Sequence, residues 1–324
     1  MDRIDAHAHI NGDDSRTLAC LEEMGLKVMN ICVAHNDWRE GARTAYRALA
    51  RAHPQRYGWC TTFDLPDYTV ADSEYADRAI AELDNDFRDG AVAVKAWKNI
   101  GMELRSPDGA PVLIDDPIFD PVYEHVASVG KPMLMHIGEP LECWLPLREG
   151  SVHYGYYSRH PEWHMHERTD LPSHQDLMQA RDRVLARHPS LRVIGAHLGS
   201  LEYDVAQIAD RFDRYPNFAV DVSARLADLM AQPAQKVREF FLRYPERILF
   251  GTDIVSRQQH SDMESPDLEA WLAEFRTTNE LYYRYFETSA TVGMWGQESE
   301  GIQLPADVLE RFYTLNARAW YPGL

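Results

Sequence analysis

The chain has 324 residues, of which 45% are hydrophobic and 26% charged, and its formal net charge is −18 at pH 7. This length and composition are typical of a soluble globular protein with a sizeable core. The negative charge excludes a nucleic acid as the expected partner, because phosphate binding requires a basic surface. A membrane partner is also not expected, since no stretch approaches the ~18 apolar residues of a membrane span.

The cysteines and the N-terminus together predict a reducing, cytoplasmic location. The four cysteines are widely spaced and form no CxxC pair, so neither a disulfide framework nor a thiolate zinc site is predicted. The chain starts with an acidic Asp2 instead of a basic segment and an apolar run, so no secretory signal is predicted. Histidine is the one unusual residue type, with fourteen copies in local clusters.

Short apolar runs typical of strands alternate with longer runs of helical period. Strands are predicted at residues 3–10, 27–34, 57–63, 91–97, 131–138, 191–198, 217–223 and 247–254. Helices are predicted between them at residues 15–24, 38–53, 70–89, 117–130, 174–188, 202–214 and 226–244.

This alternation predicts a parallel sheet, because parallel strands require crossover helices. Eight such units in about 250 residues match the size of a (β/α)₈ TIM barrel. The alternative, a doubly wound open sheet, has a Gly-rich turn after its first strand, and "HAHINGDD" lacks that pattern. We therefore predict an α/β chain with one TIM-barrel domain over residues 1–324.

Two segments exceed the minimal barrel repeat. Residues 139–172 follow the fifth strand and form a long insertion rich in aromatic residues, histidine and proline. Residues 255–304 follow the eighth strand, where we predict one helix at 267–286 and then an irregular stretch. An amphipathic helix over "LPADVLERFYTLNARAWY" (304–321) is predicted to end the chain.

The first predicted strand carries two histidines, His7 and His9, near its carboxyl end. Side chains two apart on a strand point the same way, with Cα atoms ~6.6–7 Å apart, so both imidazoles can reach one metal at ~2.0–2.1 Å. The carboxyl end of a barrel strand is also where TIM-barrel enzymes hold their catalytic groups. The spacing alone is weak, because His164 and His166 repeat it inside the insertion.

Three further strands end in residues that bind metals. His136 ends the fifth strand, His197 the sixth and Asp253 the eighth. A single residue of this kind would more often be structural, but aspartate is rarely buried unless it is paired or bound to a metal. Four strand ends with this chemistry predict one metal site.

These residues resemble the amidohydrolase superfamily of metal-dependent (β/α)₈ barrels, over nearly the whole chain. The segments "GAHLGS", "LFGTDI" and "LPADVLERFYTLNA" are most similar to its amidohydrolase-related branch of lactone hydrolases, carboxylate decarboxylases and hydratases. The resemblance implies that a divalent metal, zinc first and manganese as the alternative, is held by His7, His9, His136 and Asp253. It implies that His197 is a ligand of a second ion or a substrate contact.

Lys95 leaves the number of metal ions per chain open at one or two. Binuclear members of the superfamily carry a carboxylated lysine at the end of the fourth strand, commonly followed two residues later by an aromatic residue. "VKAWKN" is similar, with Lys95 and Trp97. In the alternative, Lys95 stays cationic and binds a substrate carboxylate.

Candidate substrate contacts are less specific. Arg159 and Arg225 suit a carboxylate, because the guanidinium fork binds it bidentately, although most arginines of an acidic protein make surface salt bridges. Lys98 is assigned to the substrate or to the surface. Trp144 belongs to the aromatic insertion, which would form a pocket wall or a packed loop. Asp221, on the seventh strand, is assigned a structural role.

The predicted reaction is hydrolysis of a small carbonyl compound, foremost a lactone of a sugar acid or dicarboxylate. A metal ion lowers the pKa of its bound water to ~7. Asp253 is predicted to act as the general base, and His197 to stabilise the developing charge. The alternatives are a metal-dependent decarboxylase of a small aromatic or unsaturated acid, and an inactive barrel that serves as a binding module. A homo-oligomer is compatible with the sequence, but no interface can be predicted.

Overall fold

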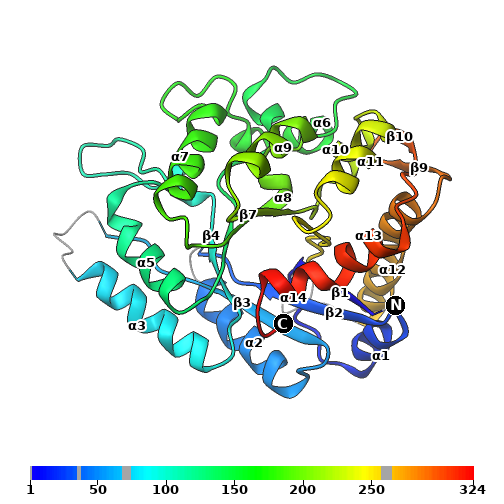
Figure 1. Ribbon diagram of the computed structural model, residues 1–324, viewed down its shortest axis with the longest axis horizontal. Helices are drawn as coiled ribbons and strands as arrows, with labels where there is room; N and C mark the ends of the chain where they lie inside the picture. The colour runs from blue at the N-terminus through cyan, green and yellow to red at the C-terminus, as the bar shows by residue number, and fades with distance from the viewer. Residues whose placement is uncertain (1, 35–37, 68–73, 257–264) are drawn as a thin grey trace.

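The predicted strands form one parallel sheet in sequential order. The computed structural model describes residues 2–34, 38–67, 74–256 and 265–324. The strand order is β1-β2-β3-β4-β5-β6-β7-β8, and helices surround the strands (Figure 1). The strands are β1 (Arg3–Ala8), β2 (Leu26–Ile31), β3 (Tyr57–Thr62), β4 (Ala93–Ala96), β5 (Met133–Met135), β6 (Val193–Gly195), β7 (Phe218–Asp221) and β8 (Ile248–Leu249).

Backbone hydrogen bonds between the first and last strands close the sheet into a barrel. The Ala6 N–H donates to the Phe250 carbonyl at 3.0 Å, and the Asp253 N–H donates to the His7 carbonyl at 2.7 Å. Beyond the ends of both strands, His9 and Val255 form a parallel bridge. The chain is therefore a (β/α)₈ TIM barrel, as the sequence predicts.

The helices follow the predicted positions, with one clear break. The outer helices are α1 (Ser15–Glu23), α2 (Trp38–Ala52), α3 (Tyr75–Arg88), α5 (Asp120–Ser128), α7 (His174–Arg187), α9 (Val205–Arg214) and α11 (Ala234–Arg243). The predicted helix 226–244 is wrong as one element, because Pro233 separates α10 (Leu226–Met230) from α11. Proline lacks the N–H and clashes with the preceding turn. Residues 70–73 of another predicted helix lie outside the described residues.

The barrel interior is filled by one apolar cluster with a contribution from every strand. Its members include Ile4, Ala6, Met29, Ile31, Cys60, Ala93, Leu134, Ile194, Ala219 and Leu249. The final helical segment, α13 (Ala306–Glu310), a π-helical turn at Arg311–Leu315 and α14 (Asn316–Trp320), lies against this cluster through Ala317, Trp320 and Tyr321. The carboxyl ends of the strands are therefore the accessible end of the barrel.

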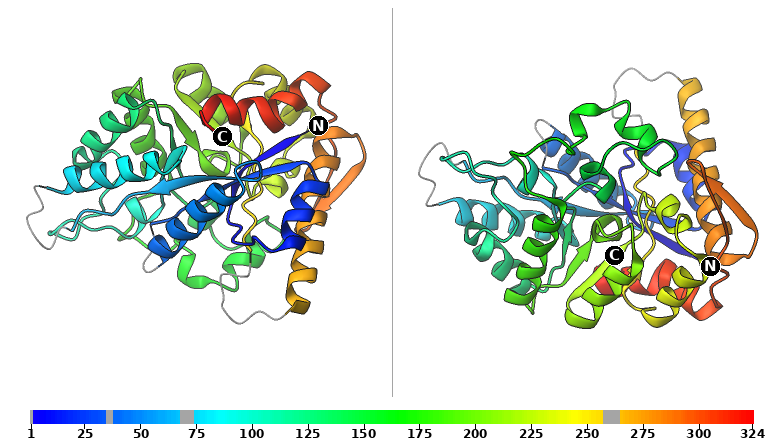
Figure 2. Two further views of the ribbon diagram at one scale, coloured as in Figure 1. Left: turned by 90° about the horizontal axis from the view of Figure 1, so that it is seen from below. Right: turned by 90° about the horizontal axis from the view of Figure 1, so that it is seen from above.

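The segment after β8 is more regular than predicted. The long helix α12 (Ser265–Glu287) confirms the predicted 267–286. The expected irregular stretch is wrong in part, because β9 (Thr291–Met294) and β10 (Gln297–Glu300) form an antiparallel hairpin. The strand β10 is entirely polar, and β9 has only two alternating apolar side chains, Val292 and Met294, so the apolar signal is too short to predict a strand. Both views in Figure 2 show the hairpin beside α12.

Three short helices lie in the loops at or near the carboxyl ends of the strands: α4 (Asn99–Met102), α6 (Tyr154–Tyr157) and α8 (Ala196–Gly199). Within the described residues, every helix is too short or too polar to cross a membrane.

Candidate metal centre

His7, His9 and Asp253 converge at the carboxyl end of the barrel. The His9 Nε2 lies 3.2 Å from Asp253 Oδ1, and the His7 Nε2 lies 3.5 Å from the same oxygen. One ligand atom from each of the three residues lies within 4.8 Å of the others. The prediction that the first and last strands contribute to one site therefore agrees with the geometry.

A β-bulge in β1 directs both histidines into the barrel. Asp5 pairs with Val28 and Ala8 with Asn30, so β1 has one more residue than β2 between these two pairs. An extra residue reverses the alternation of side chains. Ile4 and Ala6 point into the barrel core before the bulge, and Ala8 packs in the outer core after it.

The buried Asp5 carboxylate holds this bulge. It accepts the N–H of His7 at 3.1 Å and the N–H of Thr252 at 3.1 Å. The Thr252 hydroxyl donates to its second oxygen at 2.5 Å. Burial raises the pKa of Asp5 to about 7. Asp5 thus joins β1 to the segment that carries Asp253.

Asp221 orients the imidazole of His7 and holds the backbone of His197, a role that the sequence analysis missed. Its Oδ2 accepts from His7 Nδ1 at 2.8 Å, and its Oδ1 accepts the backbone N–H of His197 at 2.9 Å. A carboxylate on the far nitrogen of a histidine fixes the tautomer and leaves Nε2 free to bind a metal. The available signal was that Asp221 also ends a barrel strand.

His136 and His197 occupy the neighbouring side of the site. Their ring centroids are 4.3 Å apart, and His197 Nε2 lies 4.0 Å from Asp253 Oδ2. Burial holds the pKa of both histidines well below the ordinary value. Among the described residues, the buried His136 Nε2 has no hydrogen-bond partner. Buried polar atoms are usually paired, so an unpartnered imidazole nitrogen at this place is available to bind a metal ion.

Asp253 completes this donor set as an anion. Burial alone would raise its pKa, but the imidazoles of His197, His9 and His7 outweigh burial and hold the pKa of Asp253 well below its ordinary value. Deprotonated carboxylate and neutral imidazoles are the forms that bind a divalent metal. The residues present therefore fit a divalent ion.

The backbone of this site is strained. His197 has a φ of 58° and Asp253 a φ of 61°, in the left-handed region that residues other than glycine rarely adopt. Ala224, at the same end of the barrel, has a φ of 54°. Such strain gathers at functional sites, where the surrounding structure over-determines the conformation.

Lys95 lies within the centre, as predicted. Its Nζ is 3.4 Å from His7 Nε2, and the side chain is buried. Burial lowers the pKa of Lys95 to about 8. A divalent ion on His7 would disfavour the ammonium form further by charge repulsion. Lys95 therefore loses its proton more readily than an exposed lysine, and carboxylation requires that loss.

A cavity of about 670 Å³ opens above the centre. His136, His197 and Asp253 line it, together with three of the four predicted substrate contacts, Lys98, Arg159 and Arg225. Trp144 is the exception, since it does not line this cavity, and its indole N–H donates to the Pro172 carbonyl at 3.1 Å. Its side chain supports the insertion instead of contacting the cavity.

The three cationic side chains that line this cavity differ in how acidic neighbours balance their positive charge. Lys98 forms a buried ion pair with Glu139, which also accepts the Tyr157 hydroxyl at 3.0 Å. Arg159 is exposed. Burial alone would lower the pKa of Arg225, but Asp228, Glu202 and other nearby acidic groups raise it. Its Nε has no partner among the described residues. Arg225 is therefore a buried cation with a free hydrogen-bond donor.

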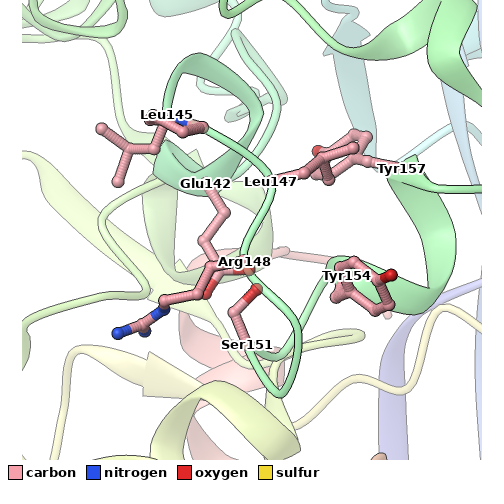
Figure 3. Close-up of a pocket in the computed structure, with 8 residues that line it drawn as sticks. Glu142, Leu145, Leu147, Arg148, Ser151, Tyr154 and Tyr157 are labelled. Atoms are coloured by element: carbon pink, nitrogen blue, oxygen red, sulfur yellow. The ribbon is translucent and has the colours of Figure 1, made fainter.

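The insertion covers one side of the centre and contains a second cavity of about 540 Å³. Figure 3 shows Glu142, Ser151, Tyr154 and Tyr157 around it. The Glu142 carboxylate accepts the N–H of His153 at 2.9 Å, and the His153 ring pairs with Asp228 at 2.9 Å. The insertion is thereby attached to the loop that follows β7.

The barrel and this cluster define the class of the protein: a TIM-barrel protein with a candidate divalent-metal centre at the carboxyl end of its strands. The profile of the Amidohydro_2 family, described as amidohydrolase, matches residues 4–323. The chain belongs to this family, whose members are metal-dependent. The resemblance in the sequence analysis is therefore confirmed.

Solved structures with similar folds extend over the same length. An uncharacterised TIM-barrel protein, Bb4693 from Bordetella bronchiseptica, has a TM-score of 0.55 and 16% identity, covering 100% of this chain and 99% of its own. The 2,6-dihydroxybenzoate decarboxylase from Rhizobium has a TM-score of 0.56 and 17% identity, with coverages of 99% and 98%. The dihydroxybenzoic acid decarboxylase from Polaromonas sp. JS666, with bound manganese and the inhibitor 2-nitroresorcinol, has a TM-score of 0.53 and 14% identity, with coverages of 99% and 96%.

Among curated proteins, none matches this chain.

Proposed function

We propose that this chain is a metal-dependent hydrolase of a small carbonyl compound, specifically a lactone of a sugar acid or of a dicarboxylic acid. The observation that carries the proposal is the convergence of His7, His9 and Asp253 beside the unpartnered His136, at the floor of a cavity that also presents Arg225. The partner in this proposal is a small molecule, with neither a nucleic acid nor a membrane involved.

The proposed ligands of one ion are His7, His9, His136 and Asp253. Zinc is the proposed metal, with manganese as the alternative, because imidazole-rich sites with one carboxylate suit both ions. When bound, a divalent ion polarises the substrate carbonyl and lowers the pKa of a water molecule to ~7.

Asp253 is the proposed general base. Its carboxylate takes a proton from the attacking water, whose oxygen forms the new bond to the carbonyl carbon. The ring C–O bond then breaks, and the proton passes to the leaving ring oxygen. The proposed role of His197, whose Nε2 lies 4.0 Å from Asp253 Oδ2, is to stabilise the oxygen that becomes negative. Because its Nδ1–H donates to the Ser223 carbonyl at 2.9 Å, this role requires a proton on Nε2 as well. Arg225 and Arg159 are placed to bind a substrate carboxylate.

A second candidate is decarboxylation of a small aromatic or unsaturated carboxylic acid. The similar structures from Rhizobium and Polaromonas favour it, since both proteins are decarboxylases of dihydroxybenzoates. The same centre would then bind the acid, and a proton would replace the departing CO₂ on carbon. The third alternative is an inactive binding module. It is disfavoured because every position where a metal ligand is expected carries a histidine or an aspartate.

Metal content per chain is the first test, by elemental mass spectrometry on protein purified without chelators. We expect one ion per chain. Two ions would make Lys95 a carboxylated bridging ligand and Lys95→Met would then lose one of them. No bound metal, together with no rise in melting temperature on adding Zn²⁺ or Mn²⁺, would overturn the proposal in favour of the inactive module.

The second test separates hydrolase from decarboxylase on the metal-loaded protein. Lactone hydrolysis releases one proton per turnover near pH 7, whereas decarboxylation evolves CO₂ and consumes a proton. We expect proton release with a panel of sugar-acid and dicarboxylate lactones. CO₂ evolution from aromatic acids, without lactone turnover, would instead establish the second candidate.

A further inference from the structure

The tip of the β9–β10 hairpin places a tryptophan at the entrance of the cavity. Trp295 lines the same cavity as His197, Asp253 and Arg225. Its side chain is 54% exposed, the largest exposure of any large hydrophobic residue in the described part of the chain. The metal centre and its proposed mechanism do not require this residue.

Trp295 occupies a backbone position that disfavours tryptophan. Met294 pairs with Gln297, so the hairpin loop has two residues, and Trp295 and Gly296 have φ values of 50° and 79°. Positive φ at both positions is the pattern of a type I′ turn, for which Asn-Gly is preferred. A bulky residue in the left-handed region is strained. Asparagine would relieve the backbone strain at this position and would expose no apolar ring. The chain nevertheless has a strained, solvent-exposed tryptophan here.

The base of the hairpin is fixed, so the backbone holds Trp295 at the cavity. Val292 is buried, and the Gly301 and Ile302 N–H groups donate to the carbonyls of Ala290 and Tyr285 at 3.0 and 2.7 Å. A Cβ at Gly301 would lie 2.2 Å from the Thr288 carbonyl oxygen, so only glycine permits this close packing.

The hairpin is also linked to the insertion on the other side of the cavity. The Gln297 side chain donates to the Gly150 carbonyl at 3.3 Å. Gly150, Tyr154 and Tyr156 of the insertion line the cavity together with Trp295. The entrance is therefore bounded by aromatic rings from two segments that lie far apart in sequence.

We propose that Trp295 is a specificity-determining residue that contacts the ring face of a cyclic carboxylate substrate. This inference rests on the proposed function, and it names the side chain that recognises the substrate ring. An indole offers a flat apolar face with a negative π surface, which packs against the C–H face of a sugar-acid ring or against an aromatic ring. An acyclic carboxylate of equal charge has no such face.

The test compares W295N with wild type and W295F in calorimetric binding of three probes to the metal-loaded protein. D-galacturonate supplies a sugar-acid ring, 2,6-dihydroxybenzoate an aromatic ring, and D-gluconate an acyclic carboxylate of the same single negative charge. We expect W295N to weaken binding of at least one cyclic probe about tenfold and that of D-gluconate less than twofold, while W295F stays within about threefold of wild type. The cyclic probe that binds identifies the type of ring.

The melting temperature separates recognition from a structural role. We expect W295N to melt at or above the wild-type temperature, because asparagine tolerates positive φ. Tyr203→Asn, which removes another exposed aromatic ring away from the cavity, is the matched control and should leave binding of all three probes unchanged. On any cyclic substrate that is turned over, W295N should raise KM about tenfold with kcat within twofold.

Several results would overturn the inference. These are no binding of either cyclic probe to wild type, equal losses for cyclic and acyclic probes, unchanged affinity in W295N, or a lower melting temperature or altered oligomeric state in W295N. Selective loss of cyclic probes without proton release from any lactone would overturn only the hydrolase proposal. Proton release with an unchanged KM in W295N would overturn only the role of Trp295.

Discussion

Two His-x-His pairs in this chain have the same spacing and different surroundings. The ring centroids of His7 and His9 are 5.8 Å apart, and those of His164 and His166 are 6.0 Å apart. In β1 the Nε2 atoms of the pair face the carboxylate of Asp253. In the insertion the rings instead donate to the carbonyls of Leu145 and Trp144 at 2.8 and 3.1 Å.

The comparison teaches that the partner of each ring nitrogen, and not the spacing of the motif, defines a metal site. Among the described residues, no cluster with metal-binding geometry includes His164 or His166. His164 is half-buried and His166 is exposed, and both rings donate to backbone carbonyls of the insertion. His7 and His9 lie beside the carboxylate of Asp253. This residue is far away in the sequence and comes near only because the barrel closes.

The largest expected effect comes from removing that anion. Asp253→Asn should lower kcat by about 10³-fold or more, since the variant loses the proposed general base and a charged ligand. Steady-state kinetics on the substrate identified above measure the loss, and metal analysis shows how much of it is due to the ion. H164Q is the matched control and should keep wild-type kcat. Equal losses in both variants would remove the distinction between the two pairs.

A buried histidine outside the centre tests whether burial alone matters. His174 Nε2 donates to the Ser200 carbonyl at 2.8 Å, and burial lowers the pKa of His174 to about 4. The unfolded chain, with a value near 6.5, binds the proton first, so His174 makes stability fall by up to about 3 kcal/mol as pH drops from 6.5 to 4. Urea unfolding of wild type and H174Q across this range measures the difference. The two proteins should retain the same metal content at pH 7, and parallel stability profiles would contradict the assignment.

The hydrogen bond that orients His7 can be changed without removing a proposed metal ligand. Asp221→Asn replaces the carboxylate that fixes His7, and it should reduce metal affinity about 10- to 100-fold, as such supporting groups typically do. Competition with a chromophoric chelator measures the affinity. Glu142→Gln, which changes a carboxylate of the insertion, is the matched control. A loss of metal in E142Q as large as that in D221N would show that the effect is not specific to the centre.

The smallest effects are expected from the insertion pair itself. His164→Ala and His166→Ala should each lower stability by about 1 kcal/mol or less, since each removes one exposed hydrogen bond. Denaturant unfolding measures the change, and metal content should equal that of wild type. Metal loss from either variant would make the insertion a contributor to the centre and break the comparison.

The sequence by itself determined the strand runs, their alternation with helices and the residues that end the strands. Apolar period and turn residues are local signals, so eight strands and most helices could be located from them. The resemblance carried by His7, His9, His136, His197 and Asp253 led to the family that the chain belongs to.

Only the tertiary structure decided which side chains enter the centre. The bulge after Asp5 directs His7 and His9 inward, and it depends on a hydrogen bond to Thr252, 247 positions away. Asp221 orients His7, the Trp144 indole donates to Pro172, and Trp295 lies at the cavity on a hairpin whose second strand is entirely polar. Local sequence encodes the period and propensity of an element, whereas the neighbour of each side chain is set by barrel closure and by hydrogen bonds between distant residues.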